Sequence, residues 1–406
     1  RHKFENLNEI PAPDYDLETN YILEKNGNFS KLNESHIGKW IFYHGIRGCI
    51  YTCRFCCNNS LDKIYEGKGA KIRKKSIQLV IKELQDLIKK FPKVERIWFT
   101  DDDVNMRTVE ELQEFRRLYK ENIGLPFQCY MSPTTVTETK LKLLIETGLK
   151  QIEFGVQTGS DRVNREIYGR PIFKKAVLRA AEIVNKYKKF IDSVNFQFIT
   201  TNPYESKEDI LETINLIRKF PSPFMIQAYG LVFFPGSPMY YKAISDGYIE
   251  KFDDSGYDVD FLNYQKHVKL KNKNTYLNSM IHMMGTNSTS FRNGLIPRFA
   301  FKYLLKDEVI EFFENKPKLI KFINSAVEKI RGSYIAEIVH YPNKIKGLVY
   351  SIVPKKVKEP IKKALKLDIY SKDYIPVTIE FEATETDKEQ NLQSSQPTLK
   401  ILNNPN

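Results

Sequence analysis

Apolar residues between positions 40 and 235 alternate between two patterns. One pattern is a short apolar run, and the other places apolar residues three and four positions apart, the period of a helix with one buried face. One example is the segment from Ile77 to Ile88, in which apolar residues recur at helical spacing and Pro92 marks the end. The short runs, which predict strands, lie at residues 40–44, 96–100, 127–131, 151–156, 194–200 and 224–233. The pattern therefore predicts strands and helices that alternate six times.

Local signals mark the ends of several of these helices. Thr108 with Glu111, and Ser206 with Asp209, have the spacing of residues that cap a helix N-terminus. Gly148 follows an apolar helical segment and is a typical C-terminal cap. These signals support the helices that the apolar period predicts.

Apolar strands joined by helices through short connections are typical of a parallel sheet covered by helices. Right-handed crossovers curl such a sheet toward a barrel. A complete eight-unit barrel takes about 250 residues, and only six units are visible here. We therefore predict an α/β fold, a partial (β/α)6 TIM-like barrel over residues 39–240 with a mainly helical C-terminal region.

Three further segments flank the predicted barrel. Residues 1–38 are polar and contain Pro11 and Pro13, which indicates an N-terminal arm or linker. Residues 241–380 are predicted to form a helical C-terminal domain. Residues 381–406 are rich in Gln, Asn, Ser and Thr, and we expect them to be disordered.

Polar residues follow the predicted strands at one edge of the sheet. Catalytic groups of parallel barrels sit at the C-terminal ends of the strands. Asp101–Asp103, Gln157, Asn202 and Pro235 each follow a predicted strand, and a cysteine-rich loop follows the first strand. We therefore expect a functional site at this edge.

Four of the five cysteines lie in the segment GCIYTCRFCC, residues 48–57. Cys49, Cys53 and Cys56 have the spacing C-x3-C-x2-C, so their thiolates can converge on one iron–sulfur cluster. A four-iron cluster held only by cysteine uses four thiolates. Three ligands leave one iron open, and an open metal position is typical of a catalytic site.

Zinc binding, burial as apolar side chains and disulfide formation are the alternative roles for these cysteines. A structural zinc site would take a fourth ligand, usually from a second C-x2-C or H-x3-H pair, and none follows. Cys57 adjoins Cys56, and neighbouring residues rarely both reach one metal, while Cys129 stands alone. Buried apolar cysteines are a second alternative, and the spacing is too tight for ordinary disulfides. The clustering favours the iron–sulfur site.

Composition bounds the class of protein. A chain of 406 residues that is 41% hydrophobic suffices for one large domain and a smaller one. No run of about 18 apolar residues predicts a membrane span, and the cysteine usage predicts a cytoplasmic protein. The net charge is +13 but is spread along the chain, so a nucleic-acid partner is not expected. The Lys-rich run at 354–366 favours a solvated helix face, with a membrane-surface or nucleic-acid contact as the alternative.

The segment CIYTCRFC, Cys49–Cys56, resembles the cluster motif of the radical S-adenosylmethionine (SAM) superfamily, in which Phe55 fills the aromatic position. The resemblance implies that Cys49, Cys53 and Cys56 hold a 4Fe–4S cluster and that SAM chelates the open iron. In that family one electron from the cluster cleaves SAM into methionine and a 5′-deoxyadenosyl radical, which abstracts hydrogen. An electron donor such as ferredoxin or flavodoxin is implied as a partner.

The same resemblance implies which residues bind SAM. Thr100, Asp101 and Asp102 lie where the family carries a glycine-glycine-glutamate-like segment near the SAM ammonium; a loop turn or an acidic helix start is the alternative. The segment EFGVQTGS resembles the fourth-strand segment of the family, with Gln157 and Ser160 as the cofactor-binding residues and Gln157 at the ribose.

Three further segments extend the implied SAM site. Arg170 in YGR would bind the SAM carboxylate, with a structural surface role as its alternative. Asn202 and Glu205 would meet the adenosyl group. The segment 230–238, which contains Leu231, resembles the one whose backbone approaches adenine.

The segment NLNEIPAPDYDL, Asn6–Leu17, resembles the joint between the corrinoid domain and the barrel in the cobalamin-binding branch of the superfamily. No D-x-H-x-x-G corrinoid motif occurs, and the chain begins with Arg1. We expect upstream truncation, and cobalamin is implied as a cofactor only together with an upstream domain.

The leading hypothesis is a radical SAM enzyme that methylates, or modifies by related chemistry, a small-molecule substrate. Methylthio transfer to transfer RNA would take a second cluster, for which only Cys57 and Cys129 are left. A non-catalytic electron carrier would close the cluster with a fourth cysteine. Aromatic residues in and after the sixth predicted strand are candidates for the substrate lining or for core: Tyr229, Phe233, Tyr240 and Tyr241.

Overall fold

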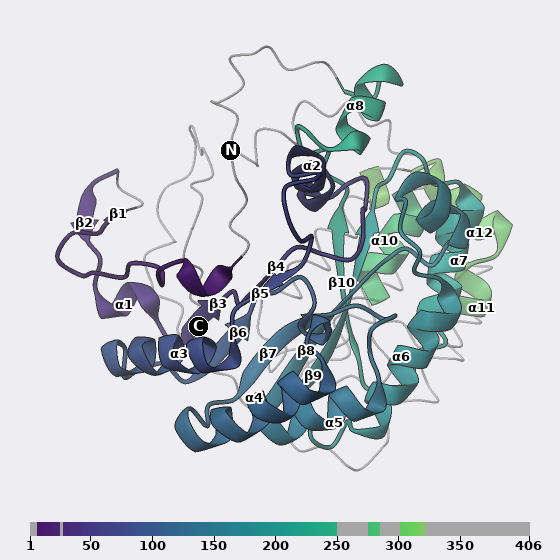
Figure 1. The fold of residues 1–406 in the computed structure, drawn as a ribbon. Helices are drawn as coiled ribbons and strands as arrows, with labels where there is room; N and C mark the ends of the chain where they lie inside the picture. The colour runs from purple at the N-terminus through teal and green to yellow at the C-terminus, as the bar shows by residue number, and fades with distance from the viewer. Residues whose placement is uncertain (1–5, 25–26, 250–274, 285–300, 317, 321–406) are drawn as a thin grey trace, which may run out of the picture.

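Six strands form one parallel sheet in the computed structural model, which describes residues 6–24, 27–249, 275–284, 301–316 and 318–320 (Figure 1). The spatial order is β10-β9-β8-β7-β6-β3, so each strand lies beside its neighbour in the alternation. The strands are β3 (Trp40–Tyr43), β6 (Arg96–Phe99), β7 (Phe127–Met131), β8 (Leu149–Gln157), β9 (Ser193–Thr200) and β10 (Met225–Gly230). A short antiparallel pair, β4 (Ile46–Arg47) and β5 (Arg73–Lys74), flanks the cysteine loop.

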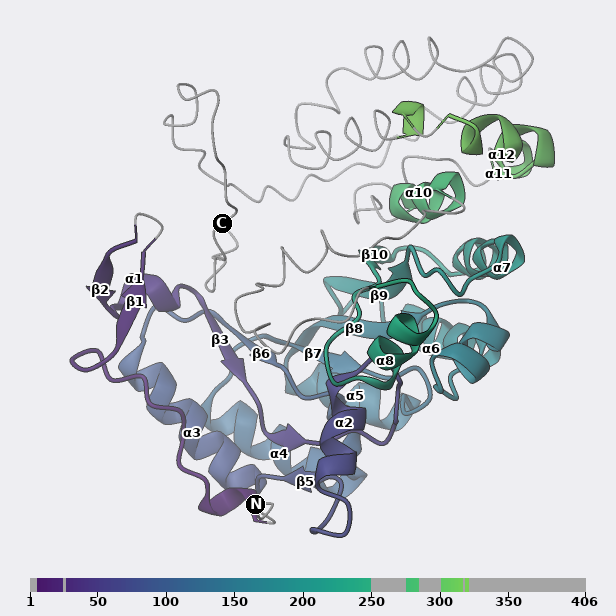
Figure 2. The same cartoon turned by 90° about the horizontal axis from the view of Figure 1, so that it is seen from above.

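The helices that connect these strands all lie on the convex side of the sheet. Figure 2 shows the sheet as an arc with these helices outside it. They are α3 (Ile77–Lys90), α4 (Val109–Asn122), α5 (Glu138–Thr147), α6 (Lys174–Lys186) and α7 (Lys207–Ile217). The arc stays open between β3 and β10, which are the two edge strands. The predicted partial barrel is confirmed.

The two faces of the sheet differ in character. Successive residues of a strand point to opposite sides, and the set facing the helices is apolar and buried. It includes Ile97, Phe99, Phe127, Ile152, Phe154, Phe196, Phe198 and Ile226. The alternate residues, which include Glu153 and Gln197, face the concave side. The main core therefore lies between the sheet and its helices.

Most of the predicted boundaries agree with the structure within two residues. Thr108 and Ser206 both form complete capping boxes, and Gly148 caps α5 with a φ of 132°. The largest difference is the sixth strand, predicted to reach Phe233. Its pairing with β9 ends where Gly230 meets Thr200, because β9 itself ends there. Beyond Gly230 only the backbone N–H of Leu231 still reaches β9 among the described residues, at the carbonyl of Thr200.

The predicted N-terminal arm contains regular structure and packs on the barrel. It holds a short hairpin, β1 (Tyr21–Leu23) with β2 (Phe29–Lys31), and the helix α1 (Glu34–Ile37). Leu7 is buried, and the side chain of Asn8 accepts a hydrogen bond from the backbone N–H of Ser76, which begins α3. A few apolar and capping residues in a polar segment thus suffice to fix it.

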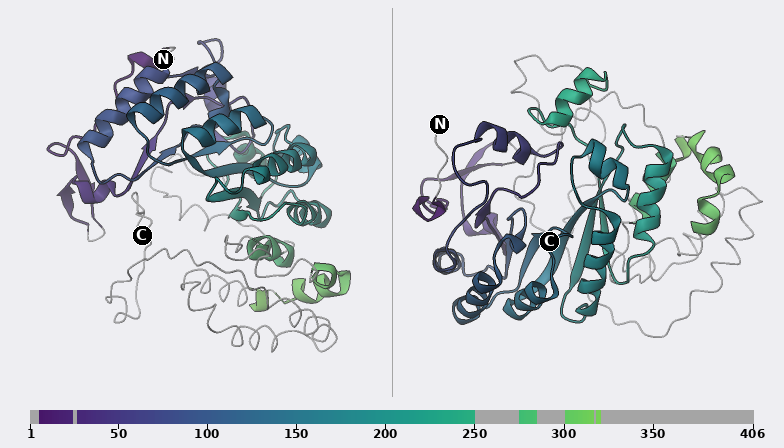
Figure 3. Two further views of the ribbon diagram at one scale, coloured as in Figure 1. Left: turned by 90° about the horizontal axis from the view of Figure 1, so that it is seen from below. Right: turned by 45° about the vertical axis from the view of Figure 1, so that its right-hand side comes forward.

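The described parts of the C-terminal region are helical. They are α8 (Pro238–Ser245), α10 (Thr275–Met284), α11 (Phe301–Leu304) and α12 (Asp307–Glu314). Figure 3 shows α10 and α12 beyond the β10 edge, and α10 contacts both β10 and α7. The predicted tail, 381–406, lies outside the described residues. None of the described helices has the length and apolar character needed to cross a bilayer.

Candidate functional site

The loop between β4 and the helix α2 (Cys57–Ile64) carries Cys49, Cys53 and Cys56. Gly48 allows the loop to start, because its φ is 94° and a Cβ there would lie 2.1 Å from the carbonyl oxygen of Lys71. Only glycine tolerates both the positive φ and so close an approach. The backbone before the first cysteine is therefore held tightly against the segment that leads into β5.

The three thiols differ in exposure from the fourth cysteine of the loop. Cys53 is buried, Cys49 and Cys56 are half-buried, and Cys57 is exposed at the first position of α2. Burial raises the pKa of Cys49 to about 11 and that of Cys56 to about 12. All five cysteines, which lie within the described residues, are free thiols. Cys129 is fully buried in the main core and does not face the loop.

Arg170 places a buried positive charge beside these thiols. It is 6% exposed, so it has no surface role. Its guanidinium donates to the carbonyls of Gly155, at 2.7 Å, and Val156, at 3.0 Å, at the end of β8. Burial raises the pKa of Cys53, and the charge and hydrogen bond of Arg170 oppose that increase. Three thiolates beside a fixed guanidinium fit a negatively charged iron–sulfur cluster.

A zinc site receives no support from the described part of the chain. No three His, Cys, Asp or Glu side chains there converge as ligands of a single metal ion. Thiolates that share a four-iron cluster bind different irons, so they need not converge on one point. The donor set of the loop therefore suits a cluster better than a single ion.

The acidic segment after β6 separates into two roles. Asp101 is buried and accepts backbone hydrogen bonds from Gly45 and Ile46, both at 2.7 Å, which fixes the turn after β3. Asp103 is buried and caps the short helix η2 (Val104–Met106). Asp102 is exposed and accepts a hydrogen bond from Asn58 of α2 at 2.9 Å. Asp101 and Asp103 thus have the structural roles, in a loop turn and at a helix start, that were the alternative to SAM binding. Asp102 has neither role and faces the cysteine loop.

Thr100 lies at the same edge and donates from its hydroxyl to the carbonyl of Tyr43 at 3.2 Å. Gln157 ends β8 with a φ of 74°, a conformation that non-glycine residues rarely adopt. A Cβ added to Gly155 would lie 2.9 Å from Gln157 Nε2 and 3.3 Å from Arg170 Nη2. The side chains of Gln157 and Arg170 therefore converge over Gly155. The positive φ of Gln157 is a strained backbone conformation, and such conformations concentrate at functional sites.

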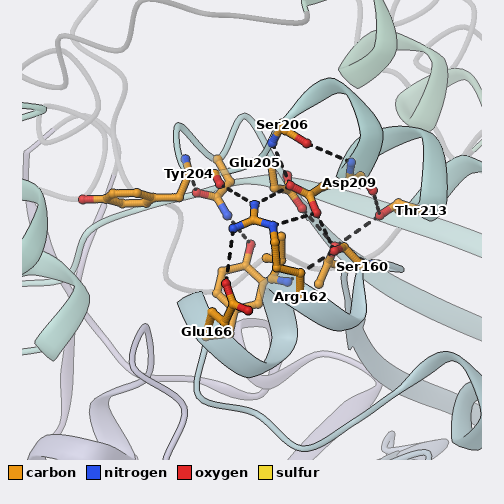
Figure 4. Close-up of polar contacts among 12 residues, drawn as sticks. Ser160, Arg162, Glu166, Tyr204, Glu205, Ser206, Asp209 and Thr213 are labelled. Carbon is orange, nitrogen blue, oxygen red and sulfur yellow. Dashed lines mark hydrogen bonds and ion pairs between the residues drawn. The ribbon is translucent and has the colours of Figure 1, made fainter.

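Ser160 belongs to a buried network that joins the end of β8 to α7 (Figure 4). Its hydroxyl donates to Asp209 Oδ1 at 2.6 Å, and Asp209 also pairs with Arg162. Burial alone would raise the pKa of Asp209, but the hydrogen bonds from Arg162, Ser160 and Ser206 outweigh it and lower the pKa to about 2. Cofactor binding by Ser160 stays a prediction beside this structural role.

Asn202 and Glu205 lie close to this network. Asn202 donates to the hydroxyl of Tyr168 at 3.1 Å and accepts from the backbone of Tyr204 at 3.0 Å. Glu205 accepts from the hydroxyl of Thr158 at 2.9 Å. Both side chains are buried near the C-terminal ends of β8 and β9, at the edge of the sheet where the cysteine loop lies.

The buried carboxyl of Glu205 predicts a specific pH dependence of stability. Burial raises its pKa to about 8 from a usual 4.5, so the unfolded chain releases this proton at lower pH than the folded chain. The free energy of unfolding should therefore fall between pH 4.5 and 8, by up to about 1.4 kcal/mol per pH unit. Glu205→Gln should flatten this fall in urea unfolding measured at pH 5 and pH 8.5. Glu182→Gln, at an exposed carboxyl of α6, is the control; an equal pH dependence in both variants would contradict the prediction.

An apolar cluster fixes the cysteine loop to the strand ends. The ring of Phe55 meets that of Tyr168 edge-on, with centroids 4.9 Å apart. Leu231 and Phe233 pack in the same cluster, together with Tyr240. Leu231 also continues the backbone pairing by donating to the carbonyl of Thr200 at 2.8 Å. Phe233 and Tyr240 are thus core residues, whereas Tyr229 and Tyr241 are exposed.

Three residues contribute to the site although no sequence pattern predicts a role for them. The Tyr51 ring lies 5.7 Å from the guanidinium of Arg170, and its hydroxyl contacts Ser132 at 2.8 Å. Tyr168 joins Asn202 to Phe55. Glu153 is a buried carboxyl on the concave face of β8. Tyr51 lies between the motif cysteines, and Tyr168 directly precedes the Gly-Arg pair of the YGR segment. Neither segment contains a pattern that predicts contacts with residues so distant in the sequence.

Parts of the chain are similar to known proteins. Residues 43–217 match the family model of the radical SAM superfamily. An uncharacterized methyltransferase of Pyrococcus horikoshii is 26% identical over 220 residues, which cover 54% of this chain and 43% of that protein. The cytidylyl-2-hydroxyethylphosphonate methyltransferase of Streptomyces wedmorensis is 27% identical over 128 residues, 31% of this chain and 22% of that protein. The chain thus spans less than half the length of these curated relatives.

Among solved structures, the radical SAM methyltransferase TsrM of Kitasatospora setae, with tryptophan substrate and a SAM analogue bound, is similar with a TM-score of 0.45. The identity is 17%, over 55% of this chain and 42% of that one. Likeness at this level adds nothing about function. The range that matches the radical SAM family model, residues 43–217, contains the cysteine loop and its three closely spaced thiols.

Proposed function

We propose that this chain is a radical SAM enzyme in which Cys49, Cys53 and Cys56 hold a 4Fe–4S cluster. The observation that carries the proposal is the loop itself, on which these three thiols stand beside the buried guanidinium of Arg170. Cys57 is exposed and Cys129 is buried in the core, so neither is placed as a fourth ligand. One iron is then left for SAM.

When bound and reduced, the cluster supplies one electron that splits a carbon–sulfur bond of SAM into methionine and a 5′-deoxyadenosyl radical. The residues of the chain position SAM and exclude water. Asp102 offers a carboxylate for the SAM ammonium, since Asp101 and Asp103 are occupied by backbone donors. Arg170 serves the carboxylate, and Gln157 serves the ribose.

The adenosyl end of SAM would lie against the ends of β9 and β10. Asn202 and Leu231 stand there, and the apolar cluster around Phe55 and Tyr168 closes that side against water. Exclusion of water protects a reactive intermediate from side reactions. Thr100 and Ser160 are part of the same edge through their hydrogen bonds to neighbouring loops.

Methylation of a small molecule is the reaction that we propose, because both curated relatives are named as methyltransferases. Cobalamin enters this proposal only with a domain outside this chain. A ferredoxin or flavodoxin as electron donor, and a cytoplasmic setting, complete it. Methylthio transfer and simple electron transfer are the alternatives, and the placement of Cys57 and Cys129 favours neither.

Anaerobic reconstitution with iron and sulfide tests the proposal. The full chain should bind about four irons, and the reduced protein should convert SAM into 5′-deoxyadenosine and methionine, detected by liquid chromatography and mass spectrometry. SAM should also change the electron paramagnetic resonance spectrum of the reduced cluster. A reducible cluster whose spectrum ignores SAM and that forms no 5′-deoxyadenosine would indicate an electron carrier. About eight irons per chain would instead favour methylthio transfer.

A further inference from the structure

Aromatic side chains form a row on one half of the concave face of the sheet. Phe42 of β3, Trp98 of β6 and Tyr130 of β7 alternate with residues that pack against the helices. The Phe42 and Trp98 centroids are 5.3 Å apart with planes at 35°, and Trp98 and Tyr130 are 5.8 Å apart at 31°. Phe42 is 48% exposed. This half of the face is therefore apolar and rich in π electrons.

Polar side chains form the other half, on β8, β9 and β10. Glu153 accepts hydrogen bonds from Asn195 at 2.6 Å and from Gln197 at 3.2 Å. Gln197 reaches Gln227 at 3.4 Å, and the hydroxyl of Tyr229 donates to Gln227 at 2.9 Å. A polar network inside a barrel destabilises the fold unless every buried member has a hydrogen-bond partner.

Two buried polar atoms of this face lack a hydrogen-bond partner among the described residues. Asn195 Oδ1 and Trp98 Nε1 are both buried without a hydrogen bond there. Glu153 is 4% exposed, and within the described part of the chain no Lys or Arg neutralises it. Buried polar atoms are nearly always satisfied, and a buried carboxylate is normally paired. Asn195 Oδ1 therefore lacks a donor among the described residues. Glu153 has two amide donors there but no cation to balance its charge.

The face lies directly below the proposed SAM site. Glu153 precedes Gly155 by two residues, and Gln157 and Arg170 converge over Gly155. At about 3.3 Å per residue along a strand, Glu153 lies about 7 Å deeper in the barrel than Gly155. A molecule held between Glu153 and the aromatic row would therefore sit within a few ångströms of that site.

We propose that the concave face is the substrate subsite and that it selects a flat aromatic or heteroaromatic ring carrying an amine. The ring packs on Trp98 and Tyr130, and the amine binds the carboxyl of Glu153. Aromatic surfaces bind flat rings and cations well, and a buried carboxylate gives its strongest hydrogen bonds to charged nitrogen. This assignment rests on the proposed function, because it names the substrate class of the same site.

Binding of matched probes to the full chain tests the assignment without cluster or SAM. Isothermal titration calorimetry at pH 8 would compare tryptamine with indole-3-propionate, which lacks the amine, and with hexylamine, which lacks the ring. Tryptamine should bind most tightly. Glu153→Gln should weaken tryptamine by about tenfold or more. It should not weaken indole-3-propionate, whose own carboxylate is repelled by Glu153. Glu182→Gln makes the same charge change at an exposed carboxyl and should change nothing.

A second variant keeps the test valid if Glu153→Gln folds poorly. Trp98→Leu should weaken tryptamine but not hexylamine, because it removes the ring contact and keeps the carboxyl. If no probe prefers the unmodified chain, or if Glu153→Gln binds tryptamine as tightly as the unmodified chain, the assignment is wrong. Formation of 5′-deoxyadenosine with no selective amine binding would overturn the subsite alone. Selective binding without SAM cleavage would overturn the proposed function alone.

Discussion

Replacement of Cys53 by Ala should abolish both cluster binding and SAM cleavage. Cys53 is the middle thiol of the loop and is the one that Arg170 contacts. A site with three thiolate ligands loses a third of its protein ligands with this change, and the remaining two are too few to retain a four-iron cluster. Iron and sulfide per chain should fall to background after reconstitution, and 5′-deoxyadenosine should fall below detection.

Cys57→Ala is the matched control for this change. Cys57 neighbours Cys56 in sequence, yet its side chain is exposed at the start of α2. Its removal should leave iron content and SAM cleavage at the level of the unmodified chain. Cys53→Ala itself should keep the fold, because a small apolar side chain is replaced by a smaller one, at a cost of about 1 kcal/mol in the free energy of unfolding. Loss of the cluster in Cys57→Ala, or its retention in Cys53→Ala, would refute the ligand assignment.

The strands could be predicted from the sequence because burial of one or both faces leaves a local signature. Phe127–Met131 was predicted to the residue, since its ends coincide with the ends of the apolar run. The sixth strand was overextended because Leu231 and Phe233 are as apolar as strand residues, yet they pack in the cluster around Tyr168. Periodicity shows that a residue is buried but not which element buries it.

The proposed cluster ligands could be selected from the sequence because they lie within eight positions of one another, from Cys49 to Cys56. The proposed SAM-binding residues could not be ranked in the same way. Ser160 meets Asp209, 49 positions away in the chain, and no local pattern signals such a contact. The acidic segment shows the same limit, since Asp101 and Asp102 are chemically identical but only Asp101 is enclosed by backbone donors.

Gly48→Ala should destabilise the fold and disorder the cysteine loop. The φ of Gly48 is 94°, and an added Cβ would lie 2.1 Å from the backbone oxygen of Lys71. Neither backbone can move without breaking the short β4–β5 pair. A non-glycine residue at positive φ costs about 1–2 kcal/mol, and the overlap adds to this, so we expect a loss of about 3 kcal/mol or more in the free energy of unfolding.

Gly67→Ala separates the cost of the positive φ from the cost of the overlap with Lys71. Gly67 also has a positive φ, 68°, but an added Cβ there would have nothing within 4 Å. Urea unfolding should show a loss of about 1 kcal/mol in this control, and its cluster content after reconstitution should be normal. Gly48→Ala should lose most of its iron as well as stability, since the displaced backbone leads directly into Cys49. Equal stability of the two variants would mean that the contact with Lys71 relaxes freely. Normal iron content in a destabilised Gly48→Ala would mean that the cluster itself orders the loop.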